Sequence, residues 1–155
     1  MKQKVSDYIA EYIAQWGIRD VFTVTGGGAM HMNDAFGHHK MLHCTYQHHE
    51  QACAMAAEAY ARLGNKMAAV CVTTGPGATN AILGAWIDSI PMLVFSGQAR
   101  YATTVSASGL PLRSMGVQEC NIVPVVKSLT KYAHMIVHPE NIRYHLEKAL
   151  YLGVH

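Results

Sequence analysis

The sequence predicts an open parallel α/β sheet with helices on both faces, and two observations support this fold class. Apolar segments of strand length alternate with segments of helical periodicity, which is typical of repeated βαβ units. The run from Met67 to Thr73 is almost continuously apolar, as expected for a strand buried on both faces of a parallel sheet. At 155 residues, we expect one domain spanning 1–155.

The expected elements follow from periodicity and from the residues that end helices. Apolar residues between Val5 and Trp16 fall at helical spacing, and Gly17 is a helix stop signal. Beyond this helix, we expect strands at 21–25, 41–46, 67–73, 91–96 and 132–137, and helices at 30–36, 50–63, 78–88, 121–126 and 139–152. The stretch 97–116 lacks periodicity and predicts a long loop, and long ordered loops are often functional.

Composition excludes several classes of partner. The net charge of +2 and the lack of a Lys/Arg run argue against nucleic acid, and no apolar segment is long enough for a membrane span. The four cysteines show no CxxC pairing, so we expect reduced thiols in a cytoplasmic protein. Five of the ten histidines fall between 38 and 49, but without metal-ligand spacing, and we predict no metal site there.

Polar and glycine-rich stretches follow four of the predicted strands. Sites in open parallel sheets form where strands reach their carboxyl ends, so these stretches should meet at one edge. They are 26–28, 48–51, 73–77 and 96–98.

The two glycine runs do not match phosphate-binding motifs. The run at 26–28 has His31 where a GxGxxG motif needs its third glycine, and the run at 74–77 is not followed by the lysine of a P-loop. Two interpretations remain for each run. Glycines without Cβ atoms allow the backbone to approach a flat ligand, or the runs form ordinary tight turns.

Glu50 begins an alanine-rich helix directly after a predicted strand. An acidic residue in a first helical turn is ordinarily explained by the helix dipole, so the position alone does not indicate chemistry. The alanines between 52 and 61 leave little side-chain bulk, so the helix can pack very closely. That packing could form a tight core within one chain or a seam between two chains.

Two longer stretches together carry a resemblance to a known family. They are HHEQACAMAAEAYAR at 48–62 and TTGPGATNAILGAWIDSIPMLVFSGQ at 73–98. With the glycine turn, the 117–119 stretch and the 129–131 stretch, the chain resembles the N-terminal, pyrimidine-binding domain of thiamine-diphosphate-dependent enzymes of the acetolactate synthase type.

The resemblance implies a role for each matching residue. Glu50 corresponds to the glutamate that hydrogen-bonds N1′ of the cofactor's aminopyrimidine and shares a proton with it, which activates the cofactor toward a 2-oxo acid. Gln118 corresponds to a glutamine near the reacting carbon. The positions expected to lie against or near the pyrimidine are Gly27, Gly28, Pro76, Gly77 and Asn80. In this family the glycine turn of one subunit faces the glutamate of the other, which implies a homodimer or higher oligomer.

Departures from the family pattern concern the substrate and not the cofactor. Gly26 stands where synthases of this family usually have proline, His48 or His49 where they commonly have arginine, and Val117 where an aromatic residue is common. The resemblance therefore implies a decarboxylase or carboligase acting on a 2-oxo acid, without fixing which acid or product.

In enzymes of the family that the chain resembles, a second domain with a Gly-Asp-Gly motif holds the diphosphate through Mg²⁺, and this chain contains no Gly-Asp-Gly. We therefore expect a second domain or subunit to hold the diphosphate and Mg²⁺, and no catalysis by this chain alone. Three alternatives remain open: a subunit of a split decarboxylase, a non-catalytic interaction module of the same fold, and a generic nucleotide-binding α/β domain.

Overall fold

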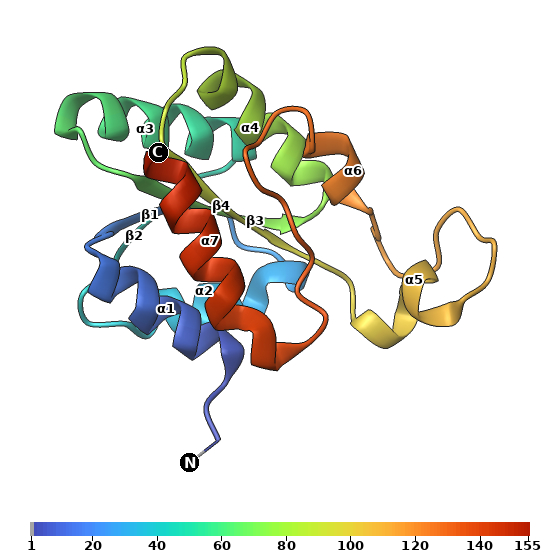
Figure 1. Cartoon of the computed structure of the whole chain (residues 1–155). Helices are drawn as coiled ribbons and strands as arrows, with labels where there is room; N and C mark the ends of the chain where they lie inside the picture. Colours follow the sequence, from blue (N-terminus) through green and yellow to red (C-terminus); the bar gives the residue numbers. More distant parts are fainter. Residues whose placement is uncertain (1) are drawn as a thin grey trace.

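A sheet of four parallel strands forms the centre of the molecule in the computed structural model, which describes residues 2–155 (Figure 1). The strands are β1 (Asp20–Thr23), β2 (His43–Tyr46), β3 (Ala68–Thr74) and β4 (Met92–Gly97), and their spatial order is β2-β1-β3-β4. All three pairings are parallel, so the four carboxyl ends lie along one edge. The predicted fold class is confirmed.

Helices connect the strands, and most lie close to their predicted positions. The longer helices are α1 (Val5–Trp16), α2 (Met30–His38), α3 (Glu50–Gly64), α4 (Pro76–Ile87) and α7 (Ile142–Val154). The shorter ones are η1 (Gly27–Ala29), η2 (Tyr101–Thr103), α5 (Val105–Ser108), α6 (Ile122–Val126) and η3 (Pro139–Asn141). Gly17 ends α1 in the left-handed conformation, with φ of 107°, as the stop signal predicted.

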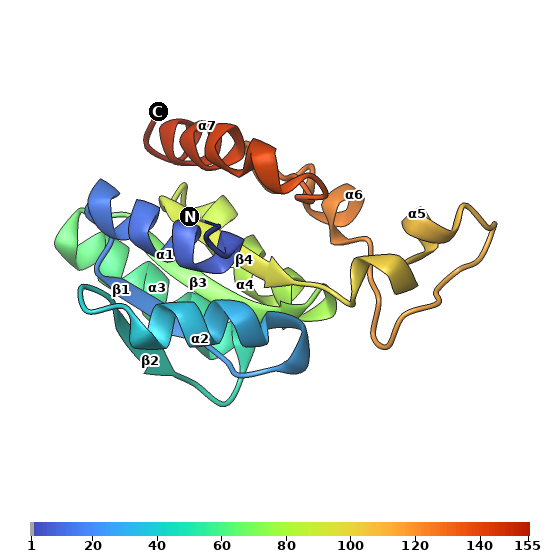
Figure 2. The same ribbon diagram turned by 90° about the horizontal axis from the view of Figure 1, so that it is seen from below.

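Two apolar layers enclose the sheet, one on each face. Alternate residues of β3 point to opposite faces, so Ala69 and Cys71 pack with α1, α2 and α7, whereas Val70 and Val72 pack with α3, α4 and α6. All four side chains are fully buried. Figures 1 and 2 show the two sets of helices on opposite sides of the sheet. This double burial explains why the β3 sequence is apolar without alternation.

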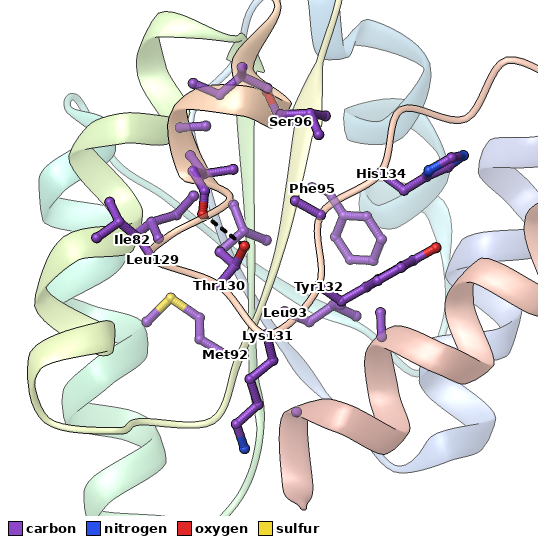
Figure 3. Close-up of a pocket in the computed structure, with 18 of the residues that line it drawn as sticks. Ile82, Met92, Leu93, Phe95, Ser96, Leu129, Thr130, Lys131, Tyr132 and His134 are labelled. Carbon is purple, nitrogen blue, oxygen red and sulfur yellow. Dashed lines mark hydrogen bonds between the residues drawn. The ribbon is translucent and has the colours of Figure 1, made fainter.

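The strand predicted at 132–137 is absent, and that prediction was wrong. These residues form an irregular segment, and within residues 2–155 the only strand hydrogen-bonded to β4 is β3. A cavity of about 580 Å³ is lined by β4, by α7 and by residues 129–136 (Figure 3). The mostly apolar residues at 132–137 have strand propensity, but a strand forms only where its backbone finds a partner.

The predicted loop at 97–116 contains two short helical segments, η2 and α5. It projects away from the sheet in both views (Figures 1 and 2). No helix among the described residues is both long and apolar enough to cross a membrane.

Candidate functional site

The carboxyl ends of β1, β3 and β4 meet closely at the glycine turn. A Cβ atom added to Gly28 would lie 2.7 Å from Oγ1 of Thr74, at the end of β3. The backbone N–H of Gln98, just after β4, donates to the carbonyl oxygen of Gly28 over 3.2 Å. The glycine turn thus lies on the ends of the neighbouring strands, as the edge rule predicts.

Glu50 and Gly77 are in direct contact on the same edge. Glu50 is the first residue of α3, and Gly77 is the second residue of α4. A Cβ atom on Gly77 would lie 2.9 Å from both Cγ and Oε1 of Glu50, which is too close for two ordinary side chains. Gly77 therefore allows the first turn of α4 to lie against the Glu50 carboxylate.

The Glu50 carboxylate is not needed to cap its own helix. His49 is the N-cap residue of α3, and its Nδ1 accepts a hydrogen bond from the backbone N–H of Gln51 over 3.1 Å. Within residues 2–155, the Glu50 carboxylate forms no ion pair and no side-chain hydrogen bond. A partly buried carboxylate with unused acceptor capacity is suited to hydrogen-bonding a ligand.

The other candidate cofactor contacts lie in the glycine turn after β1 and at the start of α4. A Cβ atom on Gly27 would meet nothing within 4 Å, so the turn leaves free space above its backbone. Pro76 and Asn80 are exposed at the start of α4, on either side of the buried Gly77. Gly77 leaves no Cβ beside the Glu50 carboxylate, so the residues present fit a flat ring that hydrogen-bonds this carboxylate.

Gln118 lies farther along the chain, on the exposed loop before α6. Its φ of 56° is in the left-handed region, which residues with a Cβ rarely adopt. No hydrogen bond in the described chain joins Gln118 to Glu50. The loop does return to the edge two residues later, because a Cβ atom on Gly75 would lie 2.7 Å from Cβ of Cys120.

Two residues that the sequence reasoning did not assign hold this loop in place. The side chain of Gln98 donates to the carbonyl oxygen of Cys120 over 2.8 Å and accepts from the backbone N–H of Ala99. The carboxylate of Glu119 accepts three backbone N–H bonds from within the loop. The hydrogen bonds of both side chains hold the loop closed, and no local residue pattern predicts them.

Cys53 lies one helical turn after Glu50 on α3. Burial raises its pKa to about 11, and the negative charge of Glu50 adds to the increase, so the thiol stays protonated at neutral pH. No group of three His, Cys, Asp or Glu side chains within residues 2–155 is arranged to hold a metal ion.

The large cavity beside β4 lies next to this edge. None of the sequence-predicted site residues lines it, although Gly97 and Gln98 lie at its end. Figure 3 shows its walls, in which Leu93 and Phe95 of β4 lie near Tyr132. It is a mainly apolar space alongside a strand, and neither Glu50 nor the glycine turn at 26–28 lines it.

Comparison with known proteins identifies the family of this chain. Residues 3–122 match the family model described as "Thiamine pyrophosphate enzyme, N-terminal TPP binding domain". The chain is 33% identical to acetolactate synthase 2, chloroplastic, of Zea mays, and 32% identical to acetolactate synthase, chloroplastic, of Arabidopsis thaliana. Each alignment covers 97% of this chain but only 23% and 22%, respectively, of the relative. The chain thus spans less than a quarter of the length of these relatives.

Proposed function

Because the chain belongs to the thiamine pyrophosphate enzymes, through their N-terminal cofactor-binding domain, we propose that it is the pyrimidine-binding part of a decarboxylase or carboligase acting on a 2-oxo acid. The single observation that carries this proposal is the contact between Glu50 and Gly77. It joins an unpaired carboxylate to bare backbone on the edge where open parallel sheets bind ligands.

In this proposal Glu50 hydrogen-bonds a ring nitrogen of the cofactor and exchanges a proton with it. A carboxylate fits this role because its oxygen can accept a hydrogen bond when ionised and donate one when protonated. Glutamine at the same position could form a hydrogen bond but could not relay the proton. When bound, thiamine diphosphate supplies the carbon nucleophile that attacks the 2-oxo group and accepts the electron pair released with carbon dioxide.

The remaining residues position the ring and the substrate. Pro76 and Gly77 begin the helix that lies against Glu50, and Asn80 lies one helical turn after Pro76. In the proposed dimer, the Gly27–Gly28 turn of one chain faces Glu50 of the other. Gln118 is proposed to hydrogen-bond the carboxylate or carbonyl group of the substrate.

A second domain or subunit is proposed to complete the site by holding the diphosphate through Mg²⁺, whose preferred ligands are oxygens. Alone, the chain is proposed to be inactive. The outer faces of α3 and α4 support pairing with another chain, because they expose large apolar side chains that a monomer would ordinarily bury. These are Met55, Leu63, Leu83, Trp86 and Ile87. We further propose a homodimer in a cytoplasmic setting.

Glu50→Gln tests the catalytic role in the protein with its diphosphate-binding domain present. We expect turnover of a 2-oxo acid such as pyruvate to fall at least about 100-fold, since proton transfer by a positioned side chain contributes on this scale. Far-UV circular dichroism should be unchanged, because no contact of the fold depends on the Glu50 charge. Glu140→Gln is a matched control, as Glu140 is an exposed carboxylate in η3.

Calorimetric titration separates the alternatives. Thiamine diphosphate with Mg²⁺ should bind, whereas NAD and ATP should not. Binding of NAD or ATP in place of thiamine diphosphate would favour the nucleotide-binding alternative. Partner association without any cofactor binding would favour the interaction module. Full turnover in Glu50→Gln would refute the role of this glutamate.

A further inference from the structure

The loop from Gln98 to Asn121 has little apolar support. Figures 1 and 2 show it projecting from the sheet, with the coil that follows α5 at its outer end. Thr104 is the only buried residue between 98 and 121, and the loop exposes Leu110, Leu112 and Met115. Since burial contributes so little, the conformation of this loop must depend mainly on polar contacts.

Glu119 supplies three of these contacts. Its Oε1 accepts from the backbone N–H of Val105 over 2.7 Å, and its Oε2 accepts from Met115 over 2.9 Å and from Gly116 over 3.1 Å. Val105 begins α5 on the outgoing limb of the loop, whereas Met115 and Gly116 lie on the returning limb. One carboxylate therefore joins the two limbs, and these N–H donors, that of Met115 first, lower its pKa below the ordinary value.

Gln118 lies directly before this junction in a conformation that needs support. Its left-handed backbone is bracketed by the Glu119 contacts and by Cys120, whose carbonyl oxygen accepts from the Gln98 side chain over 2.8 Å. The Glu119 backbone N–H also donates to the carbonyl oxygen of Gly116 over 3.0 Å, which closes a tight turn around Gln118. The turn fixes the direction in which the Gln118 side chain leaves the backbone.

We propose that Glu119 is a positioning residue, whose carboxylate ties the two limbs of the loop together and thereby holds Gln118 in its working conformation. This inference rests on the proposed function, in which Gln118 contacts the substrate. Glu119 itself does not touch the reacting atoms in this proposal. Its negative charge, with two oxygens facing three N–H donors, is the feature that the loop requires.

Glu119→Gln is the sharpest structural test, because the two side chains have the same shape. The amide has one acceptor oxygen, so it can satisfy Val105 or the Met115–Gly116 pair, and its NH₂ group then faces the remaining N–H donors. Hydrogen–deuterium exchange of the full protein should accelerate at least about tenfold at these three amides, while exchange in β3 stays unchanged. Glu140→Gln should change neither region. Unchanged exchange in Glu119→Gln would overturn the proposal.

A double-mutant cycle in the active enzyme tests whether Glu119 acts through Gln118. We expect Glu119→Gln to lower kcat/KM for the 2-oxo acid at least about fivefold, with thiamine diphosphate affinity unchanged. In a Gln118→Ala background, the same substitution should cause almost no further loss. Equal losses in both backgrounds would show a general structural effect and refute the positioning role. Failure of the proposed function is distinguishable, since it would appear as full turnover in Glu50→Gln.

Discussion

The substitutions Gly97→Ala and Gly27→Ala form a matched pair that separates an effect on folding stability from an effect on ligand binding. A Cβ atom added to Gly97 would lie 2.4 Å from the carbonyl oxygen of Gly28 and 2.8 Å from the backbone nitrogen of Ala29. Ordinary contact begins near 3.4 Å, so β4 and η1 would have to separate by about 1 Å, the difference between 3.4 and 2.4. Backbone atoms cannot rotate aside as a flexible side chain would.

The expected cost of Gly97→Ala can be built from three contributions. Overpacking costs about 1–3 kcal/mol, and loss of the Gln98-to-Gly28 backbone hydrogen bond adds about 1 kcal/mol. The reduced entropy of the unfolded chain returns about 0.4–1 kcal/mol. The net destabilisation is therefore about 2 kcal/mol, which corresponds to a Tm lower by about 4–8 °C for a chain of this size.

Urea unfolding followed by circular dichroism measures this difference directly, and thermal unfolding provides the Tm. Gly27→Ala is the control, since its Cβ would meet nothing within 4 Å, and its stability should stay within about 1 kcal/mol of the original protein. The control should nevertheless weaken thiamine diphosphate binding, because the new methyl group occupies the proposed ring site. A Gly97→Ala protein as stable as the original, or a Gly27→Ala protein equally destabilised, would refute the reasoning.

Two further predictions concern titratable groups. Burial raises the pKa of Cys71 to about 12 and that of Cys53 to about 11. Alkylation at pH 8 followed by mass spectrometry should therefore modify Cys120 well before either of these thiols. Early labelling of Cys71 would indicate local opening. The pKa of Glu119 is lowered from 4.5, so its support of the loop is complete above pH 4.5 and is lost as the pH falls through the lowered folded-state pKa. The amide proton shifts of Val105 and Gly116 should therefore titrate below pH 4.5, and a midpoint above it would contradict this sign.

The central fold was predictable because hydrophobic periodicity is a local property. Four strands and their connecting helices were expected within a few residues of their observed bounds. The rule that sites form at the carboxyl ends of parallel strands also placed Glu50 and Gly77 at the same edge of the sheet. The choice between a core within one chain and a seam between two chains is partly decided for the alanine-rich α3, because Cys53, Ala57 and Ala61 are buried within this chain. The exposed Met55 on the same helix leaves room for a contact between chains.

The wrong prediction and the missed residues share a physical cause, which is dependence on distant partners. The segment 132–137 has the side chains of a strand, but no strand within residues 2–155 pairs with it. Glu119 reads as one more acidic residue, yet its importance depends on N–H groups up to 14 positions away. A short residue pattern encodes neither the missing strand partner nor the hydrogen bonds of Glu119, so both become visible only in the folded structure.

The outer edge of β4 also has a consequence for handling the protein. Strand edges with free N–H and C=O groups are templates for strand addition between molecules, which leads to self-association and aggregation. Beside this edge lies the mainly apolar cavity of about 580 Å³, in whose lining Lys131 is the only Lys, Arg, Asp or Glu side chain among residues 2–155. Self-association of the 155-residue chain should therefore increase with its concentration, and a polypeptide that covers the β4 edge should remain dispersed where this chain precipitates.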